Sequence, residues 1–255
     1  MIFWHSGTGN SASVAARLAS LLSERTCRID KDVSSCFDLQ DGERVIWVFP
    51  IYSWGIPPTV LSFIRSVTLA GEGLRHFMVC TCGDDVGLSH SQWRKEIRRR
   101  GWLPVGTWSV QMPNNYVLLP GFDVDAVSVA ERKLEQSEER LQTVARGIRH
   151  AARVDDVVRG SFPWLKSHVL YPLFVRFLMS PRPFAHTDEC VHCGKCAAVC
   201  PRRNVRIGQD CCPSWGSDCA MCLACYHVCP KHAVRYGQRT VRKHQYFLPQ
   251  RQSIR

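Results

Sequence analysis

A string of four cysteines and a proline occurs twice in the C-terminal half of this 255-residue chain. The spacing is C-x2-C-x2-C-x3-C-P in both copies, which is the run that bacterial proteins use to bind [4Fe–4S] clusters. In two-cluster proteins with this run, the fourth cysteine of each copy ligates the other cluster. The rule assigns cluster I to Cys190, Cys193, Cys196 and Cys229, and cluster II to Cys219, Cys222, Cys225 and Cys200.

Zinc and disulfides are weaker interpretations of the same residues. Zinc usually takes two C-x2-C pairs per ion, so the third and fourth cysteines of each copy would have no purpose. Disulfides do not fit a reducing compartment. Cys211 and Cys212 break the pattern, and we expect them in a hairpin as non-ligands, with a regulatory thiol role as the alternative. His192, His227 and His232 lie off the ligand spacing.

The turn Ser6-Gly7-Thr8-Gly9-Asn10-Ser11 has the composition of a phosphate site. Its glycines allow a tight bend, its hydroxyl and amide groups can donate hydrogen bonds, and the helix predicted after it favours an anion at its N-terminus. No Gly-Lys-Ser/Thr follows, so the turn is not a Walker loop. Gly7-x-Gly9-x-x-Ala12 with Asp30 loosely fits a dinucleotide fingerprint. A turn that binds nothing is the remaining alternative.

Two more loops with unusual composition follow predicted strands. One contains Tyr52, Ser53, Trp54 and Gly55. Its aromatic rings are suited either to stack on a planar ligand ring or to cap the core. The other contains Cys82, Gly83 and Asp84. Open α/β sheets bind ligands at the C-terminal ends of their strands, so we expect all three loops to line one crevice.

The elements that must position these loops follow from short apolar runs. Runs at 2–4, 45–49 and 77–80 predict buried parallel strands, with 108–110 as a fourth and 27–29 as a weaker fifth. Helical stripes of apolar residues lie between them, at 14–22, 61–67 and 134–148. This alternation predicts a doubly wound parallel α/β sheet.

The first loop resembles the flavodoxin phosphate loop, Ser/Thr-x-Thr-Gly-x-Ser/Thr, and the whole chain resembles flavodoxin–ferredoxin fusion proteins. The resemblance implies FMN, with its 5′-phosphate in the Ser6–Ser11 loop, and two [4Fe–4S] clusters. It implies that Trp54 or Tyr52 stacks on the flavin ring and that the Cys82-Gly83-Asp84 backbone is a third contact. The second cysteine motif departs slightly from the family, with Leu223 where glycine is frequent.

The expected organisation has four parts. A flavodoxin-like FMN-binding domain spans 1–153, and a helical connector spans 154–185. A small α+β ferredoxin-type domain with both [4Fe–4S] clusters spans 186–237. A basic tail, either solvated or available for docking, spans 238–255.

The formal net charge of +11 lies almost entirely in the second half. Residues 1–150 hold 17 basic and 16 acidic groups, whereas 151–255 hold 16 and 6. Two clusters and an FMN phosphate would lower the net charge to roughly +5. An acidic redox partner explains the excess better than nucleic acid, because no nucleic-acid-binding motif accompanies it. The chain shows no secretory signal or membrane span, so we expect a cytoplasmic protein.

The favoured function is electron transfer between FMN, two [4Fe–4S] clusters and external redox proteins, with no catalytic residue required. The alternative is a flavin-dependent reductase of a small acceptor such as a quinone, in which Asp84 or Asp85 would deliver protons. Non-specific nucleic-acid binding through the basic half is a third possibility, which would show a steep dependence on salt.

Overall fold

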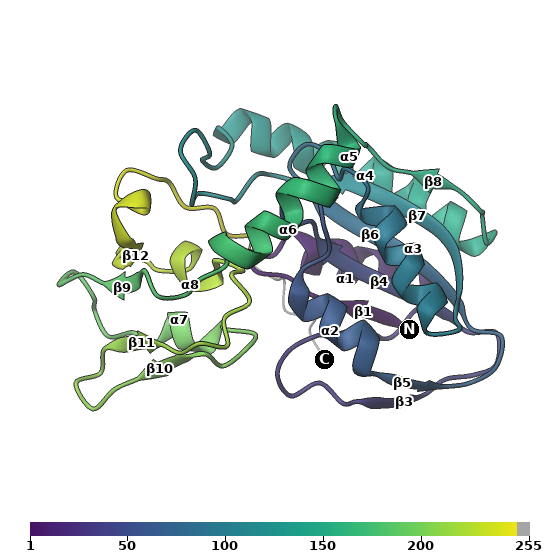
Figure 1. The fold of residues 1–255 in the computed structure, drawn as a ribbon, viewed down its shortest axis with the longest axis horizontal. Coiled ribbons are helices and arrows are strands. Elements are labelled where there is room, and N and C mark those ends of the chain that lie inside the picture. Colours follow the sequence, from purple (N-terminus) through teal and green to yellow (C-terminus); the bar gives the residue numbers. More distant parts are fainter. Residues whose placement is uncertain (249–255) are drawn as a thin grey trace.

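A six-stranded parallel sheet forms the centre of the N-terminal domain in the computed structural model, which describes residues 1–248 (Figure 1). Its strands are β1 (Ile2–Trp4), β2 (Thr26–Arg28), β4 (Arg44–Pro50), β6 (Arg75–Cys82), β7 (Leu103–Gln111) and β8 (Asp155–Asp156). Their spatial order is β2-β1-β4-β6-β7-β8. The first five strands of this sheet therefore have the order 2-1-3-4-5, which is the flavodoxin-like order. The predicted fold class is confirmed.

Helices cover both faces of the sheet. The helices α1 (Asn10–Leu22) and α4 (Val127–Arg149) pack on one face, and α2 (Pro58–Ser66) and α3 (Ser89–Arg99) pack on the other. The positions of the side chains of strand β4 explain why its sequence is continuously apolar. Val45, Trp47 and Phe49 belong to one core, whereas Ile46 and Val48 belong to the core on the opposite face. All five are fully buried, as expected for a strand covered on both sides.

The apolar periodicity did not reveal every element. The sequence analysis did not predict helix α3. Trp93 and Ile97 are the large apolar residues of this arginine-rich helix, and two such residues do not give a clear apolar stripe. The strands β3 (Cys36–Asp38) and β5 (Thr68–Ala70) pair only with each other, outside the main sheet. Strand β8 pairs with β7, so the sheet continues slightly beyond the domain end expected at residue 153.

The C-terminal module is an internal duplication. One repeat contains β9 (Phe184–His186), α7 (Lys195–Ala198) and β10 (Val205–Ile207), and the other contains β11 (Pro213–Trp215), α8 (Ala224–His227) and β12 (Val234–Tyr236). The elements of the second repeat lie 29 residues after those of the first, which is the offset of the two cysteine strings. Strand β9 pairs with β12, and β10 pairs with β11. Each hairpin-like ladder therefore joins one repeat to the other.

A single helical segment from Pro163 to Leu178 connects the two parts of the chain. It combines α5 (Pro163–Leu165) and α6 (Tyr171–Leu173) with π-helical turns at Lys166–Leu170 and Phe174–Leu178. This helix lies within residues 154–185, for which the sequence predicts a helical connector. Within residues 1–248, no helix combines the length and the apolar composition needed to cross a bilayer.

The part of the basic tail that the structure describes packs against both domains. After the short helix η3 (Gly237–Thr240), the chain runs back to the N-terminal domain. The Tyr246 hydroxyl donates to Asn10 Oδ1 at 2.8 Å, and the Leu248 N–H donates to the Thr8 carbonyl at 2.8 Å. The sequence predicts a tail that is either solvated or available for docking. Its many charged residues give no indication of the contacts that Tyr246 and Leu248 make. Residues 249–255 of the predicted tail lie outside the described residues.

One buried titratable group lies in the core of the N-terminal domain. His76 is fully buried and stacks on Trp102, with ring centroids 4.8 Å apart. Its Nδ1 accepts a hydrogen bond from Trp47 Nε1 at 3.1 Å, so the ring is neutral. Burial lowers the pKa of His76 from 6.5 to about 3.

This pKa predicts a loss of stability in acid. The unfolded chain binds a proton at His76 as the pH falls through about 6.5, whereas the folded chain does so only near 3. The stabilisation from the neutral ring is thus complete above about pH 6.5 and declines below it. Between pH 7 and 5, wild type should lose about 2 kcal/mol more unfolding free energy than His76→Gln. Denaturant titrations at both pH values measure this, and equal losses would contradict it.

Candidate functional site

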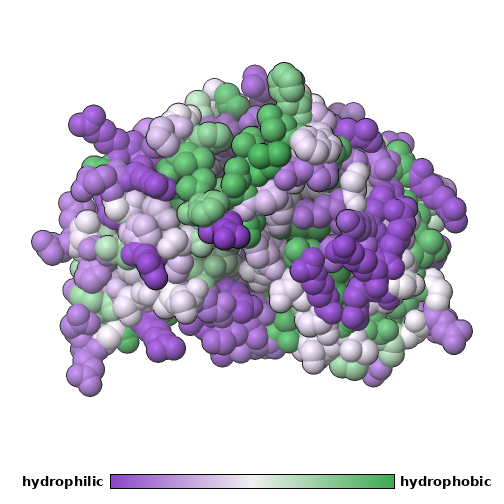
Figure 2. Space-filling model, in the orientation of Figure 1, coloured by the Kyte–Doolittle hydropathy of each residue, from purple (hydrophilic) through white to green (hydrophobic). Residues whose placement is uncertain are grey.

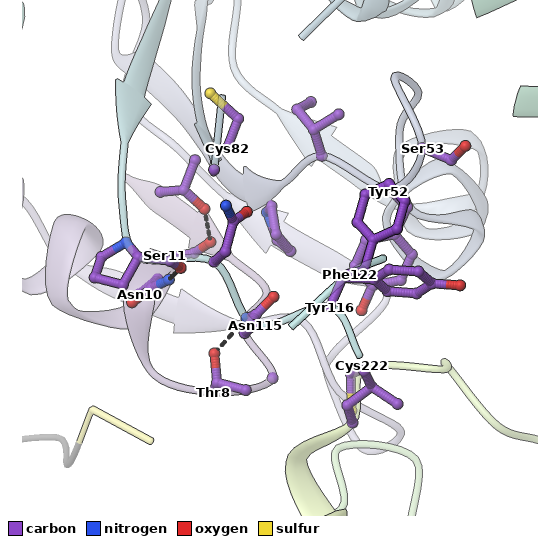
Figure 3. Close-up of a pocket in the computed structure, with 18 of the residues that line it drawn as sticks. Thr8, Asn10, Ser11, Tyr52, Ser53, Cys82, Asn115, Tyr116, Phe122 and Cys222 are labelled. Atoms are coloured by element: carbon purple, nitrogen blue, oxygen red, sulfur yellow. Dashed lines mark hydrogen bonds between the residues drawn. The ribbon is translucent and has the colours of Figure 1, made fainter. Parts of the chain in front are cut away.

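The loops at the C-terminal ends of β1, β4, β6 and β7 surround one cavity of about 220 Å³ that opens to solvent, which we call the sheet-edge cavity (Figure 3). It lies where ligands bind in open α/β sheets. Eleven of the thirteen predicted cofactor contacts line it: Ser6, Gly7, Thr8, Asn10, Ser11, Tyr52, Ser53, Trp54, Cys82, Gly83 and Asp84. The three loops predicted to share a crevice therefore do so.

The two remaining predicted contacts, Gly9 and Gly55, face other segments. Gly9 has φ = +103°, and a Cβ there would overlap the Leu248 carbonyl oxygen. A Cβ at Gly55 would overlap the Tyr171 ring of the connector helix. Both glycines thus permit close packing around the cavity without lining it.

The Ser6–Ser11 loop is held by hydrogen bonds to other strand ends. Ser11 Oγ and Thr81 Oγ1 are 2.7 Å apart, and Asn115 Nδ2 donates to Thr8 Oγ1 at 2.5 Å. Asn10 Nδ2 donates to the Pro113 carbonyl at 2.9 Å. The loop leads directly into the 13-residue helix α1, whose first turn carries no acidic residue. The backbone dipoles therefore favour an anion at this end of the cavity.

Aromatic side chains form the other end of the cavity. Tyr52, Tyr116 and Phe122 lie together in Figure 3, and Phe174 from the connector helix also lines this end. Tyr116 contacts Phe174 edge-on, with ring centroids 6.0 Å apart. The Tyr52 hydroxyl is buried without a hydrogen-bond partner within the described residues, and burial raises the pKa of this phenol well above its usual value. A buried hydroxyl without a partner costs free energy unless a ligand supplies a hydrogen bond.

Trp54 lies beside this aromatic cluster in a strained turn. Ser53 and Trp54 have φ = +43° and +64°, a region that costs energy for residues other than glycine. The Lys166 ammonium group lies 5.0 Å from the centroid of the Trp54 ring, and the Trp54 carbonyl accepts a hydrogen bond from Ser167 Oγ at 2.8 Å. The connector helix therefore holds Trp54 in place at the rim of the cavity.

Sequence reasoning missed one whole side of the cavity. Asn114, Asn115, Tyr116, Leu119 and Phe122 follow β7, the fourth strand whose C-terminal end meets this edge. Their position after a predicted strand was the available signal, because the same rule had selected the three other loops. Met221 and Leu223 also line the cavity and come from the cysteine module, so only the tertiary structure could bring them here.

The eight cysteines of the two strings gather in two separate cavities. Cys190, Cys193, Cys196 and Cys229 line the larger one, with about 400 Å³ of empty space including the solvent at its opening. Cys200, Cys219, Cys222 and Cys225 line the smaller one, with about 320 Å³ of empty space including the solvent at its opening. Each cavity thus contains three cysteines of one copy and the last cysteine of the other. Among the described residues, no three His, Cys, Asp or Glu side chains are close enough to form a site for a single metal ion.

Equivalent hydrogen bonds reach the sulfur atoms of both repeats. Asn204 N–H donates to Cys200 Sγ, and Ala233 N–H donates to Cys229 Sγ, both at 3.2 Å. Trp215 Nε1 lies 3.5 Å from Cys225 Sγ. Such donors stabilise a thiolate, which is the form that binds metal.

Burial opposes ionisation of the thiols in the smaller cavity. It raises the pKa of Cys219 to about 11 and that of Cys222 to about 12, and it raises the pKa of Cys225 further. A thiolate at these positions therefore needs a compensating cation, so metal binding would release protons here. The donor set and its burial fit an iron–sulfur cluster.

The backbone has positive φ angles at equivalent positions of the two repeats. His192 and Met221 have φ = +55° and +51°, and Gly194 and Leu223 have φ = +69° and +60°. Leu223 thus adopts the left-handed conformation that glycine adopts in the first copy. Its side chain is buried at the sheet-edge cavity, and this packing offsets the strain.

Cys211 and Cys212 lie in the turn between β10 and β11, as predicted. Cys212 Sγ is 3.7 Å from His192 Nδ1, and Cys211 is exposed at the edge of the larger thiol cavity. His227, in contrast, is buried between the domains, with Nε2 2.8 Å from the Asn115 carbonyl. Burial lowers its pKa to about 4, so it is a neutral structural side chain.

The sheet-edge cavity and the smaller thiol cavity meet at the segment Met221–Leu223. Cys222 lines both cavities. A Cβ added at Gly7 would overlap the Cys222 carbonyl oxygen, so only glycine allows the Ser6–Ser11 loop to approach this closely. The two candidate sites therefore share a wall.

Comparisons with known proteins agree with the cysteine pattern. Residues 183–204 match the family model of the 4Fe-4S binding domain. No curated protein matches the chain. Solved structures that it resembles include a Streptococcus pneumoniae flavodoxin and an NAD(P)H:quinone oxidoreductase from Methanothermobacter marburgensis. The first is 16% identical, with 56% of this chain and 97% of that one covered and a TM-score of 0.34. The second is 13% identical, with 58% and 96% covered and a TM-score of 0.36.

The shared wall predicts that Gly7→Ala damages both sites. The added methyl group forces the Ser6–Ser11 loop away from Cys222, so binding of a ligand in the sheet-edge cavity and of metal in the smaller thiol cavity should be weakened together. Gly101→Ala is the control, because a Cβ there meets nothing within 4 Å. Uptake of added FMN and of iron by anaerobically purified variants measures both effects. Uptake of both by Gly7→Ala at wild-type levels would refute the shared wall.

Proposed function

We propose that this protein is an electron-transfer flavo-iron–sulfur protein that carries FMN and two [4Fe–4S] clusters. The observation that carries the proposal is the division of eight thiols into two cavities, one of which shares Cys222 with the sheet-edge cavity. When bound, FMN exchanges two electrons in single steps and each cluster carries one, so the three groups link two-electron and one-electron donors.

The ligand assignment follows the lining of the cavities. Cluster I would be held by Cys190, Cys193, Cys196 and Cys229, and cluster II by Cys219, Cys222, Cys225 and Cys200. The antiparallel pairs β9–β12 and β10–β11 support this exchange of the fourth cysteine, because they tie the two repeats together. Cys211 and Cys212 are proposed to be non-ligands.

The sheet-edge cavity fits FMN at both ends. The Ser6–Ser11 loop and the N-terminus of α1 would hold the phosphate, and the aromatic end would hold the ring. The buried Tyr52 hydroxyl without a partner would then gain a polar group of the ligand. We propose Tyr52 as the main ring contact, since the Trp54 ring is already engaged by Lys166.

The lining of the sheet-edge cavity supports an order for the proposed redox groups. Met221, Cys222 and Leu223 line the sheet-edge cavity, so cluster II would be the neighbour of FMN, and cluster I would lie beyond it. Lys195 and Lys231 line the cavity of cluster I, and Cys193 is exposed there. We therefore propose that an acidic redox partner docks beside cluster I.

The reductase alternative is less well supported. It needs a proton donor held ready at the sheet-edge cavity. Asp85 is instead ion-paired with Lys166 at 2.7 Å, and the Asp84 side chain is 81% exposed. These positions favour a carrier that moves electrons without an acid catalyst.

Iron analysis tests the cluster assignment. Reconstituted anaerobically, the wild-type chain should contain about eight irons, four for each cubane. Cys200→Ser and Cys222→Ser should each lose about four irons and the same EPR signal of the reduced protein, although the two cysteines belong to different strings. Cys211→Ser and Cys212→Ser are the matched controls and should retain all eight. Loss of cluster I in Cys200→Ser would refute the exchange of fourth cysteines.

Flavin titration tests the ring contact. Removal of a stacking side chain weakens binding by about tenfold, so Tyr52→Ala should raise the Kd for FMN by that factor. Trp54→Ala should have a smaller effect. Fluorescence quenching of free FMN measures both. A larger effect at Trp54 would contradict the assignment of Tyr52, and a wild-type chain that takes up no FMN would refute the flavin site.

A further inference from the structure

A row of large apolar side chains lies exposed along the connector helix and at Phe162, the residue directly before it. The exposed fractions are 77% for Phe162, 63% for Trp164 and 65% for Phe177. Leu165, Leu170 and Leu173 are also exposed along the same segment. Figure 2 shows hydrophobic residues gathered over the part of the surface where Figure 1 places α5 and α6. We call these six residues the apolar row.

The inner face of the helix fixes the row in this outward position. The Tyr171 hydroxyl donates to the Ile56 carbonyl at 2.6 Å. Ser167 Oγ accepts a hydrogen bond from the Leu88 N–H at 2.7 Å, and Lys166 Nζ pairs with Asp85 at 2.7 Å. The helix cannot roll to bury the row without breaking these bonds. The exposure is therefore built into the fold.

The surroundings of the row are basic. From Val157 to Thr187 the sequence contains no Asp or Glu, and Arg159, Arg176 and Arg182 are all exposed. A segment with exposed Trp, Phe and Leu flanked by arginines is typical of helices that lie in the interface of a bilayer. The 16 residues of the helix are too few to span one. A lipid surface also accepts a protruding row of side chains without needing a matching groove.

We propose that the apolar row docks this protein on the surface of an anionic lipid bilayer. Phe162, Trp164 and Phe177 would enter the level of the lipid headgroups, and the arginines would pair with the negative surface. This inference rests on the surface of the connector helix and does not depend on the proposed redox function.

The test is co-sedimentation of the reconstituted protein with phosphatidylcholine vesicles that contain about a quarter phosphatidylglycerol. Wild type should bind, and high salt should weaken the binding. Trp164→Ser with Phe177→Ser should reduce the partition coefficient by at least about tenfold. Leu103→Ser with Val127→Ser is the matched control, because it removes two exposed apolar side chains from other elements and should bind like wild type.

Three outcomes would overturn the proposal. The first is a wild-type protein that does not bind the anionic vesicles. The second is an equal loss of binding in both double variants. The third is a dimer in sedimentation velocity that the Trp164→Ser/Phe177→Ser variant abolishes while vesicle binding persists, which would assign the row to a second copy. Circular dichroism spectra and thermal unfolding like those of wild type show that the variants are folded.

Discussion

The close approach of the Gly7 backbone to Cys222 is the contact on which the rest of the structure depends. In the proposed function a short distance between the two cofactors favours electron exchange, and a side chain at residue 7 would push their binding loops apart. The connector helix and residues 244–248 secure the same junction. Tyr171 packs on Gly55, Tyr246 binds Asn10, and His227 meets the Asn115 carbonyl. These contacts make two modules of different chemistry into one unit.

The two modules are stabilised in different ways. The sheet domain buries aromatic residues on both faces, such as Phe3, Trp47 and Trp108. The cysteine module has strands of three residues and helices of four, and its core includes the thiols themselves. Since such a small core buries little apolar area, metal binding and folding of this module are expected to be coupled.

Much of this arrangement was predictable because it depends on local patterns. The duplicated cysteine spacing predicted the repeat, and continuous apolar runs such as Val45–Phe49 predicted strands covered on both sides. The loop containing Asn115 and Tyr116 was missed because it lacks the glycines that distinguish the first loop. The approach of Cys222 to Gly7 and the hydrogen bond from Tyr246 to Asn10 could not be predicted, because each joins residues more than 200 positions apart in sequence.

The central claim is that two cubanes are held by exchanged cysteines and that one of them adjoins the flavin. The most direct measurement is an anomalous-scattering map at the iron edge from anaerobically grown crystals. The account predicts two groups of about four irons each, with the group held by Cys200, Cys219, Cys222 and Cys225 beside flavin density in the sheet-edge cavity. Single metal ions between C-x2-C pairs, or flavin density beside Cys193, would contradict it.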